Sequence, residues 1–210
     1  IDFTAESKVS VTKFVEVEIS EHKYATFYAN EPMSVPENVT AYVANTAPVM
    51  NGNEGIIALT AVAGDVVPAE TGAVISGAKG KYIFTETSAS GTPVTGNNML
   101  VGYDDAGDYA EVALPTDGSA NYILGVKDGK VGFYKKDAGF KVYKNKAYLN
   151  LPSSVAAARA IYFSFDDDAT GIFETENGKV ETENCYDLSG RRVEKAQKGV
   201  YIVDGVKVVK

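Results

Sequence analysis

The sequence predicts an all-β protein: an antiparallel β-sandwich or distorted barrel followed by a small C-terminal β-meander. Its 210 residues include 26 valines but only 7 leucines. Branched side chains such as valine fit the pleated surface of a sheet better than they fit a helix. Apolar and polar residues also alternate along several segments, which is the period of strands with one buried face. Asp-Gly pairs separate some of these segments, and such pairs favour tight hairpin turns.

The first predicted strand covers residues 9–19, where apolar residues occupy most odd positions. The same reasoning predicts further strands at 24–28, 39–43, 55–60, 73–76, 81–85, 121–126, 130–134, 147–151 and 160–165. A loop is expected between Pro32 and Pro36, and another at 88–98, where polar residues, glycine and proline concentrate. Asp128-Gly129 should form the turn of a hairpin, because a type I′ turn needs two residues with positive φ.

The chain is expected to divide near an acidic run at 166–168, giving a first domain of residues 1–170 and a second of residues 171–210. Just before it, residues 153–160 with three successive alanines are the one candidate helix, with an irregular linker as the alternative. The tail should contain short strands at 179–183, 185–188, 191–193, 200–203 and 206–209. Because some forty residues bury little core, we expect the tail to dock on the first domain or to be marginally stable.

Charge and hydropathy exclude several classes of function. The formal net charge is −8 and basic residues are scattered, which disfavours nucleic acid as a partner, since phosphate binding needs clustered lysine and arginine. No apolar run approaches the roughly 18 residues of a membrane helix, so no membrane span is expected. The chain opens on Ile1 without a methionine or a leader, and we interpret it as a processed or truncated piece.

The sequence contains few side chains suited to nucleophilic or metal-based catalysis. His22 is the single histidine, Cys185 is the single cysteine, and tryptophan is absent. A Ser-His or Cys-His nucleophilic pair would have to use His22, which we interpret instead as a solvated turn residue. Cys185 is expected to be a small buried residue in a strand, and nothing has the spacing of a zinc site. The sequence therefore predicts neither an enzyme nor a cofactor.

The strongest ligand candidate is an acidic loop flanked by two tyrosines, made of Tyr103, Asp104, Asp105, Asp108 and Tyr109. The three aspartates offer hard oxygen ligands of the kind that Ca²⁺ prefers. The two tyrosines offer rings on which a sugar can stack. The loop lacks the twelve-residue calcium pattern with its distal glutamate, so the alternative is a solvated turn in which aspartate bonds its own backbone.

Six stretches occur in the order of a known module and together span roughly residues 17 to 172: 24–28, 35–42, 67–75, 132–134, 145–149 and 158–160. They resemble a β-rich module found near the C-termini of surface and secreted proteins of Bacteroidales. The chain departs from that module at His22-Lys23, where a glycine usually precedes the tyrosine. Residues 185–193 and 198–210 are similar to the C-terminal sorting domains of type IX secretion cargo. This tail is shorter than those domains, with only Asp204-Gly205 between its last strands.

These resemblances imply an exported protein, extracellular or at the outer-membrane surface, with an adhesin-like role in adhesion, display or spacing and no catalytic residues. The implied partners are a surface glycan or protein and, through the tail, secretion or anchoring machinery. The alternative is a carbohydrate-binding accessory module of a larger extracellular protein. A hydrolase is the third interpretation, and the shortage of nucleophiles and bases argues against it.

Overall fold

The computed structural model describes residues 12–165, 185–187, 200–203 and 206–209. The chain divides into two compact units, residues 1–163 and 164–210. Every regular element in the described ranges is a β-strand, which confirms the all-β prediction. The predicted boundary between residues 170 and 171 lies outside the described residues.

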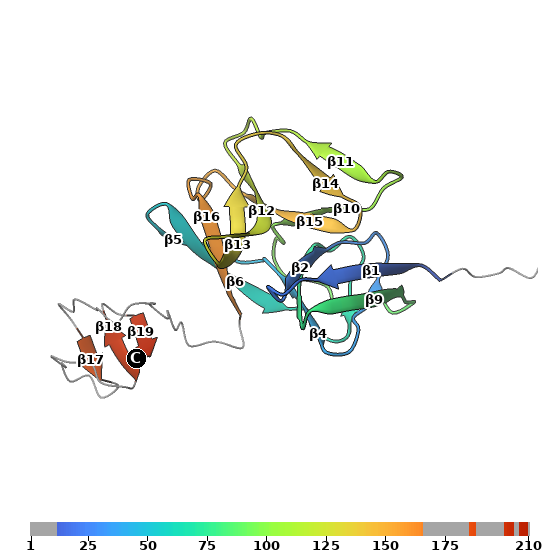
Figure 1. Cartoon of the computed structure of the whole chain (residues 1–210), viewed down its shortest axis with the longest axis horizontal. Helices are drawn as coiled ribbons and strands as arrows, with labels where there is room; N and C mark the ends of the chain where they lie inside the picture. Colours follow the sequence, from blue (N-terminus) through green and yellow to red (C-terminus); the bar gives the residue numbers. More distant parts are fainter. Residues whose placement is uncertain (1–11, 166–184, 188–199, 204–205, 210) are drawn as a thin grey trace, which may run out of the picture. The chain divides into compact units, whose positions relative to one another are not determined.

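The larger sheet of the first unit has ten strands and is barrel-like (Figure 1). Nine of them follow one another in the spatial order β10 (Leu100–Tyr103), β15 (Lys146–Leu151), β12 (Ala120–Lys127), β13 (Lys130–Lys135), β16 (Ala160–Phe165), β6 (Glu54–Ala61), β4 (Val39–Val43), β8 (Ala73–Gly77) and β2 (Tyr24–Phe27). The tenth, β5 (Val49–Asn51), pairs with β6 in a hairpin.

Hydrogen bonds between β2 and β15 nearly close the barrel-like sheet. The Tyr28 N–H donates to the Asn145 carbonyl at 3.3 Å, and the Asn145 side-chain amide donates back to the Tyr28 carbonyl at 3.0 Å. Two residues further along the chain, in β15, the Ala147 N–H donates to the Thr26 hydroxyl oxygen at 3.2 Å. These bonds join residues that are more than a hundred positions apart in the chain, so the end strand β2 meets β15, the second strand from the other end of the sheet.

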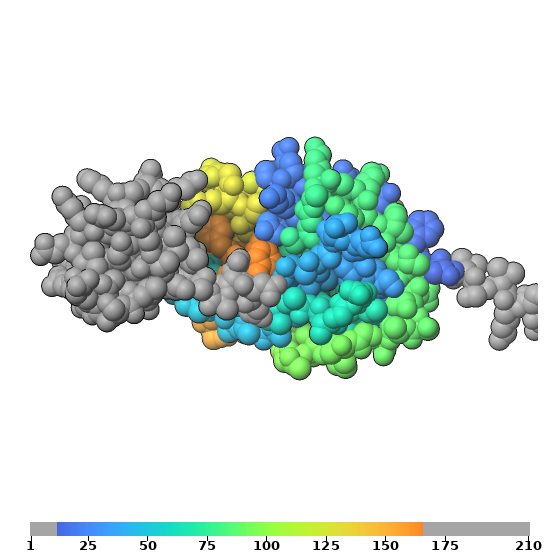
Figure 2. All heavy atoms as spheres, turned by 90° about the horizontal axis from the view of Figure 1, so that it is seen from below, coloured from blue at the N-terminus to red at the C-terminus, as the bar shows by residue number. Residues whose placement is uncertain are grey.

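A second sheet has four strands in the order β1 (Phe14–Ile19), β9 (Gly80–Glu86), β3 (Met33–Ser34) and β7 (Val66–Val67). Strand β1 alternates as predicted, with Val15, Val17 and Ile19 buried and the residues between them exposed. Its buried face packs on a core that includes Phe27 and Phe84, whose rings stack with centroids 4.4 Å apart. In the space-filling view, atoms coloured blue to green pack side by side over this part of the unit (Figure 2).

Two small sheets complete the fold. Strands β11 (Tyr109–Val112) and β14 (Phe140–Tyr143) pair with each other alone among the described strands. In the second unit, β17 (Cys185–Asp187), β18 (Val200–Val203) and β19 (Val206–Val209) form an antiparallel three-stranded sheet. The predicted pairing of 200–203 with 206–209 is confirmed, whereas the predicted strands at 179–183 and 191–193 lie outside the described residues.

The predicted strands from residue 24 to residue 165 are confirmed, and so is the loop at 88–98. The candidate helix at 153–160 is wrong, because residues 153–157 form successive turns and a strand begins at Ala160. Strand β3 lies within the predicted loop at 32–36, where it pairs with β9 and β7. The sequence patterns also missed five short strands: β5, β7, β10, β11 and β14.

Candidate functional site

The acidic loop connects β10 to β11 and is fastened by backbone bonds to the turn between β14 and β15. The Asn145 N–H donates to the Tyr103 carbonyl at 2.7 Å, and the Lys144 N–H donates to the Asp108 carbonyl at 2.8 Å. The Lys144 ammonium also donates to the Asp105 carbonyl at 3.1 Å. The loop is therefore held at both ends by a partner turn some forty residues away in the chain.

Asp104 points into the protein rather than toward a ligand. Its side chain is 0% exposed, and its Oδ2 accepts hydrogen bonds from the Lys13 ammonium at 2.6 Å and the Asn30 N–H at 3.0 Å. Lys13 also pairs with Glu31 at 2.6 Å. The other carboxylate oxygen, Oδ1, has no hydrogen-bond donor among the described residues, and the Lys144 ammonium lies 3.6 Å from it. The carboxylate thus forms an internal ion-pair network.

The charges around Asp104 decide its ionisation. Burial alone would raise the pKa of its carboxyl, but the bonds from Lys13 and Asn30 and the charges of Lys13 and Lys144 outweigh burial and hold this pKa below its usual value. The side chains of Asp105 and Asp108 are exposed. No three carboxylate, histidine or cysteine side chains in the described ranges form a group able to hold a metal ion, and the predicted set does not converge on one.

Tyr109 is exposed to solvent and lies beside a second tyrosine that the sequence patterns missed. It lies directly across from Tyr143 in the β11–β14 register, with ring centroids 6.1 Å apart in an edge-to-face arrangement. The Lys141 ammonium lies 3.8 Å from the centre of the Tyr109 ring, and Glu111 is the register partner of Lys141. Tyr109 is 40% exposed and Tyr143 is 59% exposed. We call Tyr109, Glu111, Lys141 and Tyr143 the tyrosine strip.

Tyr103, the other predicted stacking residue, is half-buried, and its hydroxyl lies over Gly107. A Cβ added at Gly107 would come within 2.9 Å of that hydroxyl, so the glycine makes room for the ring to fold over its own loop. The structure therefore separates the predicted residues. Asp104 is internal, Tyr103 covers the loop, and Tyr109 joins an exposed aromatic pair.

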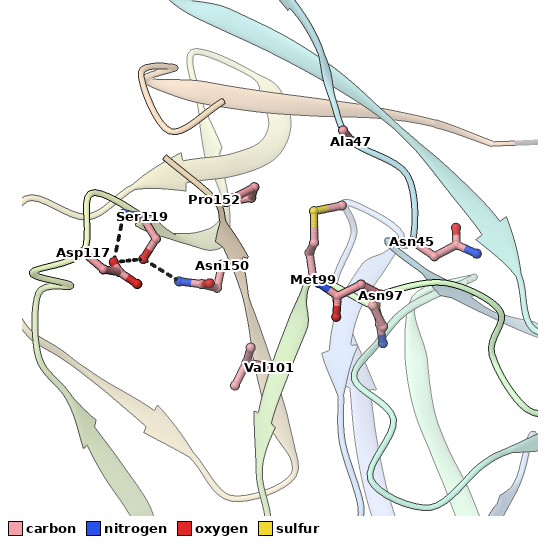
Figure 3. A pocket seen from close by; sticks show the side chains of 10 residues that line it. Asn45, Ala47, Asn97, Met99, Val101, Asp117, Ser119, Asn150 and Pro152 are labelled. Carbon is pink, nitrogen blue, oxygen red and sulfur yellow. Dashed lines mark hydrogen bonds between the residues drawn. The ribbon is translucent and has the colours of Figure 1, made fainter. Parts of the chain in front are cut away.

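A groove of about 490 Å³ lies near the start of β10 and the end of β15 (Figure 3). Its lining residues are Asn45, Ala47, Asn97, Asn98, Met99, Val101, Asp117, Ser119, Asn150 and Pro152. In the close-up, Asp117, Ser119 and Asn150 form one wall, and Asn45, Asn97 and Met99 form the facing wall. Amide, hydroxyl and carboxylate groups thus face each other across the groove, and none of its described lining residues is a lysine or arginine.

Hydrogen bonds fix both walls of the groove. The Ser119 hydroxyl donates to Asp117 Oδ1 at 2.7 Å, and the Asn150 amide donates to Asn121 Oδ1 at 2.8 Å. On the other wall, Asn98 Oδ1 accepts from the Ala44 N–H, and its amide donates to the Gly72 carbonyl at 2.7 Å. Bonds from the hydroxyl and backbone N–H of Ser119 lower the pKa of Asp117, which keeps this carboxylate ionised.

Sequence reasoning did not find the groove, because its lining comes from four segments that are far apart in the sequence, and no local pattern links them. The only local sign is the run Asn97-Asn98 at the end of the polar 88–98 stretch.

His22 lies where the sequence placed it, in an exposed turn between β1 and β2. Its N–H donates to the Ser20 hydroxyl oxygen at 3.2 Å, and its nearest charged neighbour is Glu21 at 3.9 Å. The solvated-turn interpretation of His22 is confirmed. Cys185 begins β17 as predicted.

Within the described ranges, no helix has the length and apolar character needed to cross a membrane. No family model, curated protein or solved structure matches this chain.

Proposed function

We propose that this chain is a non-catalytic module of an exported bacterial protein, secreted or held at the outer-membrane surface, with a role in adhesion or display. The observation that carries the proposal is the tyrosine strip. Two exposed rings and a cation lie together on a short sheet, and tyrosine is common at recognition surfaces because its ring buries apolar area while its hydroxyl bonds to a partner.

The use of the polar side chains supports binding rather than catalysis. Asp104, the most buried carboxylate of the predicted site, forms an ion pair with Lys13, and His22 lies exposed in a turn. General acid–base catalysis needs a group positioned toward a reacting atom with its pKa near the working pH. The neighbours of Asp104 lower its pKa instead, so it stays ionised and ion-paired.

The resemblance to surface and secreted modules of Bacteroidales supports the proposed location. The three-stranded sheet of β17, β18 and β19 fits a small folded tail of the sorting-domain kind. In this proposal the partners are a surface glycan or protein, reached through the strip, and secretion or anchoring machinery, reached through the tail. Deleting residues 186–210 in a secretion-competent host should abolish export of the parent protein, and unchanged export would contradict the sorting role.

The adhesion role can be tested with purified protein immobilised on beads. Adhesion of the beads is then measured on surfaces coated with mucin glycoproteins, extracellular-matrix proteins or arrayed glycans. A Tyr109→Ala/Tyr143→Ala variant should lose most of the adhesion seen with the original chain. An Ile83→Ala/Val126→Ala variant, which removes two exposed apolar side chains elsewhere, should keep it. Adhesion that survives loss of both tyrosines, or no adhesion to any of these surfaces, would overturn the proposal.

The second candidate is a carbohydrate-binding accessory module. The observation that favours it is the amide-lined groove, together with an exposed tyrosine pair on the same unit. Amide side chains both donate and accept hydrogen bonds, as sugar hydroxyls do. Absence of binding to any arrayed glycan at millimolar concentration would remove this candidate and leave adhesion to proteins.

A further inference from the structure

We propose that the groove between the start of β10 and the end of β15 is a binding site for a short, neutral carbohydrate. This inference assigns a site and a ligand class to the carbohydrate-binding candidate and rests on it. The site is separate from the tyrosine strip, because the groove takes none of its lining residues from β11 or β14.

The size of the groove suits such a ligand. Small-molecule sites in proteins occupy about 300–1,000 Å³, and this groove has a volume of about 490 Å³. Its two walls come from loops and from residues of β10 and β15 in the barrel-like sheet (Figure 3). The Asn150 N–H donates to the Met99 carbonyl at 2.9 Å, which ties β15 to the opposite wall. A site whose walls are already fixed loses less entropy when a ligand binds.

The polar groups of the groove match hydroxyl groups. The exposed Asn97 carries a carbonyl oxygen that accepts and an amino group that donates. Asn45 already donates to the Thr95 carbonyl and accepts from the Thr60 hydroxyl. Asn150 already donates to Asn121, so Asn45 and Asn150 offer a ligand their remaining amide hydrogens and lone pairs. Ser119 adds a hydroxyl, and Asp117 is a carboxylate whose Oδ1 is oriented by two bonds from Ser119. A carboxylate has acceptor capacity beyond those two bonds, so it can also accept from a ligand hydroxyl. Groups of both kinds on facing walls suit a ligand with many hydroxyls.

The negative charge of the groove and of the whole chain favours a neutral ligand over an anionic one. Among the described residues, the groove is lined by one ionised carboxylate, Asp117, and by no lysine or arginine. The formal net charge of the chain is −8, so an acidic sugar or a phosphate would be repelled both locally and at a distance. Ala47, Val101 and Pro152 supply apolar surface for the C–H faces of sugar rings. None of the described lining residues is aromatic, so the selectivity of the groove would come from hydrogen bonds.

The test is a nuclear magnetic resonance titration of the full chain. The probes are neutral gluco-, manno- and galacto-trisaccharides, with sialyllactose as the acidic arm. At least one neutral probe should shift the side-chain amide signals of Asn45, Asn97 and Asn150. Asn97 is exposed, so Asn97→Ala should fold normally and weaken binding about tenfold, the loss expected from one hydrogen-bonding side chain. Thr92→Ala, at an exposed position in the same loop, is the matched control and should bind as the original chain does.

A second variant tests the role of charge. Asp117→Asn keeps an oxygen that can accept from Ser119 and removes the negative charge, so it should strengthen sialyllactose binding relative to the neutral probe. If a neutral probe shifts only resonances of the tyrosine strip, the groove is not the binding site, although the chain still binds carbohydrate. No shifts with any neutral probe, or tighter binding of sialyllactose by the original chain, would overturn the inference. Neither result would affect adhesion through the strip, which is measured separately.

Discussion

Lys13 and Asp104 are 91 residues apart in the chain, and their side chains meet at 2.6 Å. Lys13 immediately precedes β1 of the four-stranded sheet, and Asp104 immediately follows β10 of the ten-stranded sheet. The ion pair therefore joins the two main sheets of the first unit. It is asymmetric, since the Asp104 side chain is fully buried while the Lys13 side chain is 31% exposed.

Asp104→Asn should lower the free energy of unfolding by about 2 kcal/mol. The substitution keeps the shape of the side chain but removes a charge that accepts hydrogen bonds from Lys13 and Asn30. Hydrogen bonds to charged groups each contribute about 1.5–3 kcal/mol, and loss of one partner leaves the other poorly compensated. Urea unfolding, followed by the tyrosine signal, measures the change.

The neighbouring Asp105 provides the control for this measurement. Its side chain is exposed, so Asp105→Asn changes the net charge equally and should alter the free energy of unfolding by less than about 0.5 kcal/mol. Similar losses in both variants would mean that the total charge matters and the buried pair does not.

The same pair predicts how stability depends on pH. The pKa of Asp104 is lowered on folding, so its contribution is fully present above its usual value of 3.8 and is lost as the pH falls through the lower, folded value. The pKa of Lys13 is raised, because its bonds to Asp104 and Glu31 outweigh burial, so its contribution is lost only above 10.5. The difference in unfolding free energy between the original chain and Asp104→Asn should be constant between these limits and shrink below pH 3.8. A difference that grows on acidification would contradict this assignment.

Much of the fold could be predicted because local chemistry and tertiary structure agree. The alternation of apolar and polar residues along β1 predicted which face of that strand is buried. The Asp128-Gly129 pair predicted the β12–β13 hairpin, and both residues have positive φ, 51° and 76°. The strands that were missed are short and depend on distant partners. Gly102 in β10 carries no side chain because the Tyr28 ring occupies that space, where an added Cβ would lie 2.0 Å from the ring. No local pattern reveals such a contact.

Only part of the candidate site could be predicted from the sequence. The sequence indicated that Tyr109 is available, and it is exposed. It gave no sign that Asp104 is buried against Lys13, because an ion pair across 91 residues leaves no local pattern. Tyr143 was missed with the strand that carries it, and the groove is assembled from four segments that no periodicity links.

Gly72→Ala should destabilise the protein by about 1–3 kcal/mol, the usual cost of overpacking. An added Cβ at Gly72 would lie 2.4 Å from the Leu100 carbonyl oxygen, a backbone atom that cannot rotate away. Gly125→Ala is the matched control, because there the nearest atom would be a Tyr134 ring carbon at 3.6 Å, an ordinary contact. Thermal unfolding of both variants should show a lower melting temperature for Gly72→Ala alone. Equal melting temperatures would mean that the approach of Leu100 to Gly72 is not tight.

Tyr122→Phe tests why residues 153–157 form turns instead of the predicted helix. The Tyr122 hydroxyl is fully buried and lies 3.1 Å from the Ala156 carbonyl oxygen and 2.9 Å from that of Ala158. The Lys135 ammonium donates to the same Ala156 carbonyl at 2.8 Å. Side chains from β12 and β13 therefore satisfy carbonyls that a helix would pair internally. Removing the hydroxyl should cost about 1–2 kcal/mol in unfolding free energy, since a buried carbonyl loses its donor.

Burial raises the pKa of Tyr122 to about 12, which adds a pH signature to this prediction. The folded protein holds that proton more tightly than the unfolded chain, so the contribution is present below the usual value of 10 and is lost as the pH rises toward 12. The original chain should therefore lose its advantage over Tyr122→Phe across that interval. Tyr134→Phe is the control, because its hydroxyl donates to the Lys130 carbonyl in an exposed hairpin and its loss should cost less. If the two phenylalanine variants unfold alike, the turns at 153–157 are held by their own backbone and not by Tyr122.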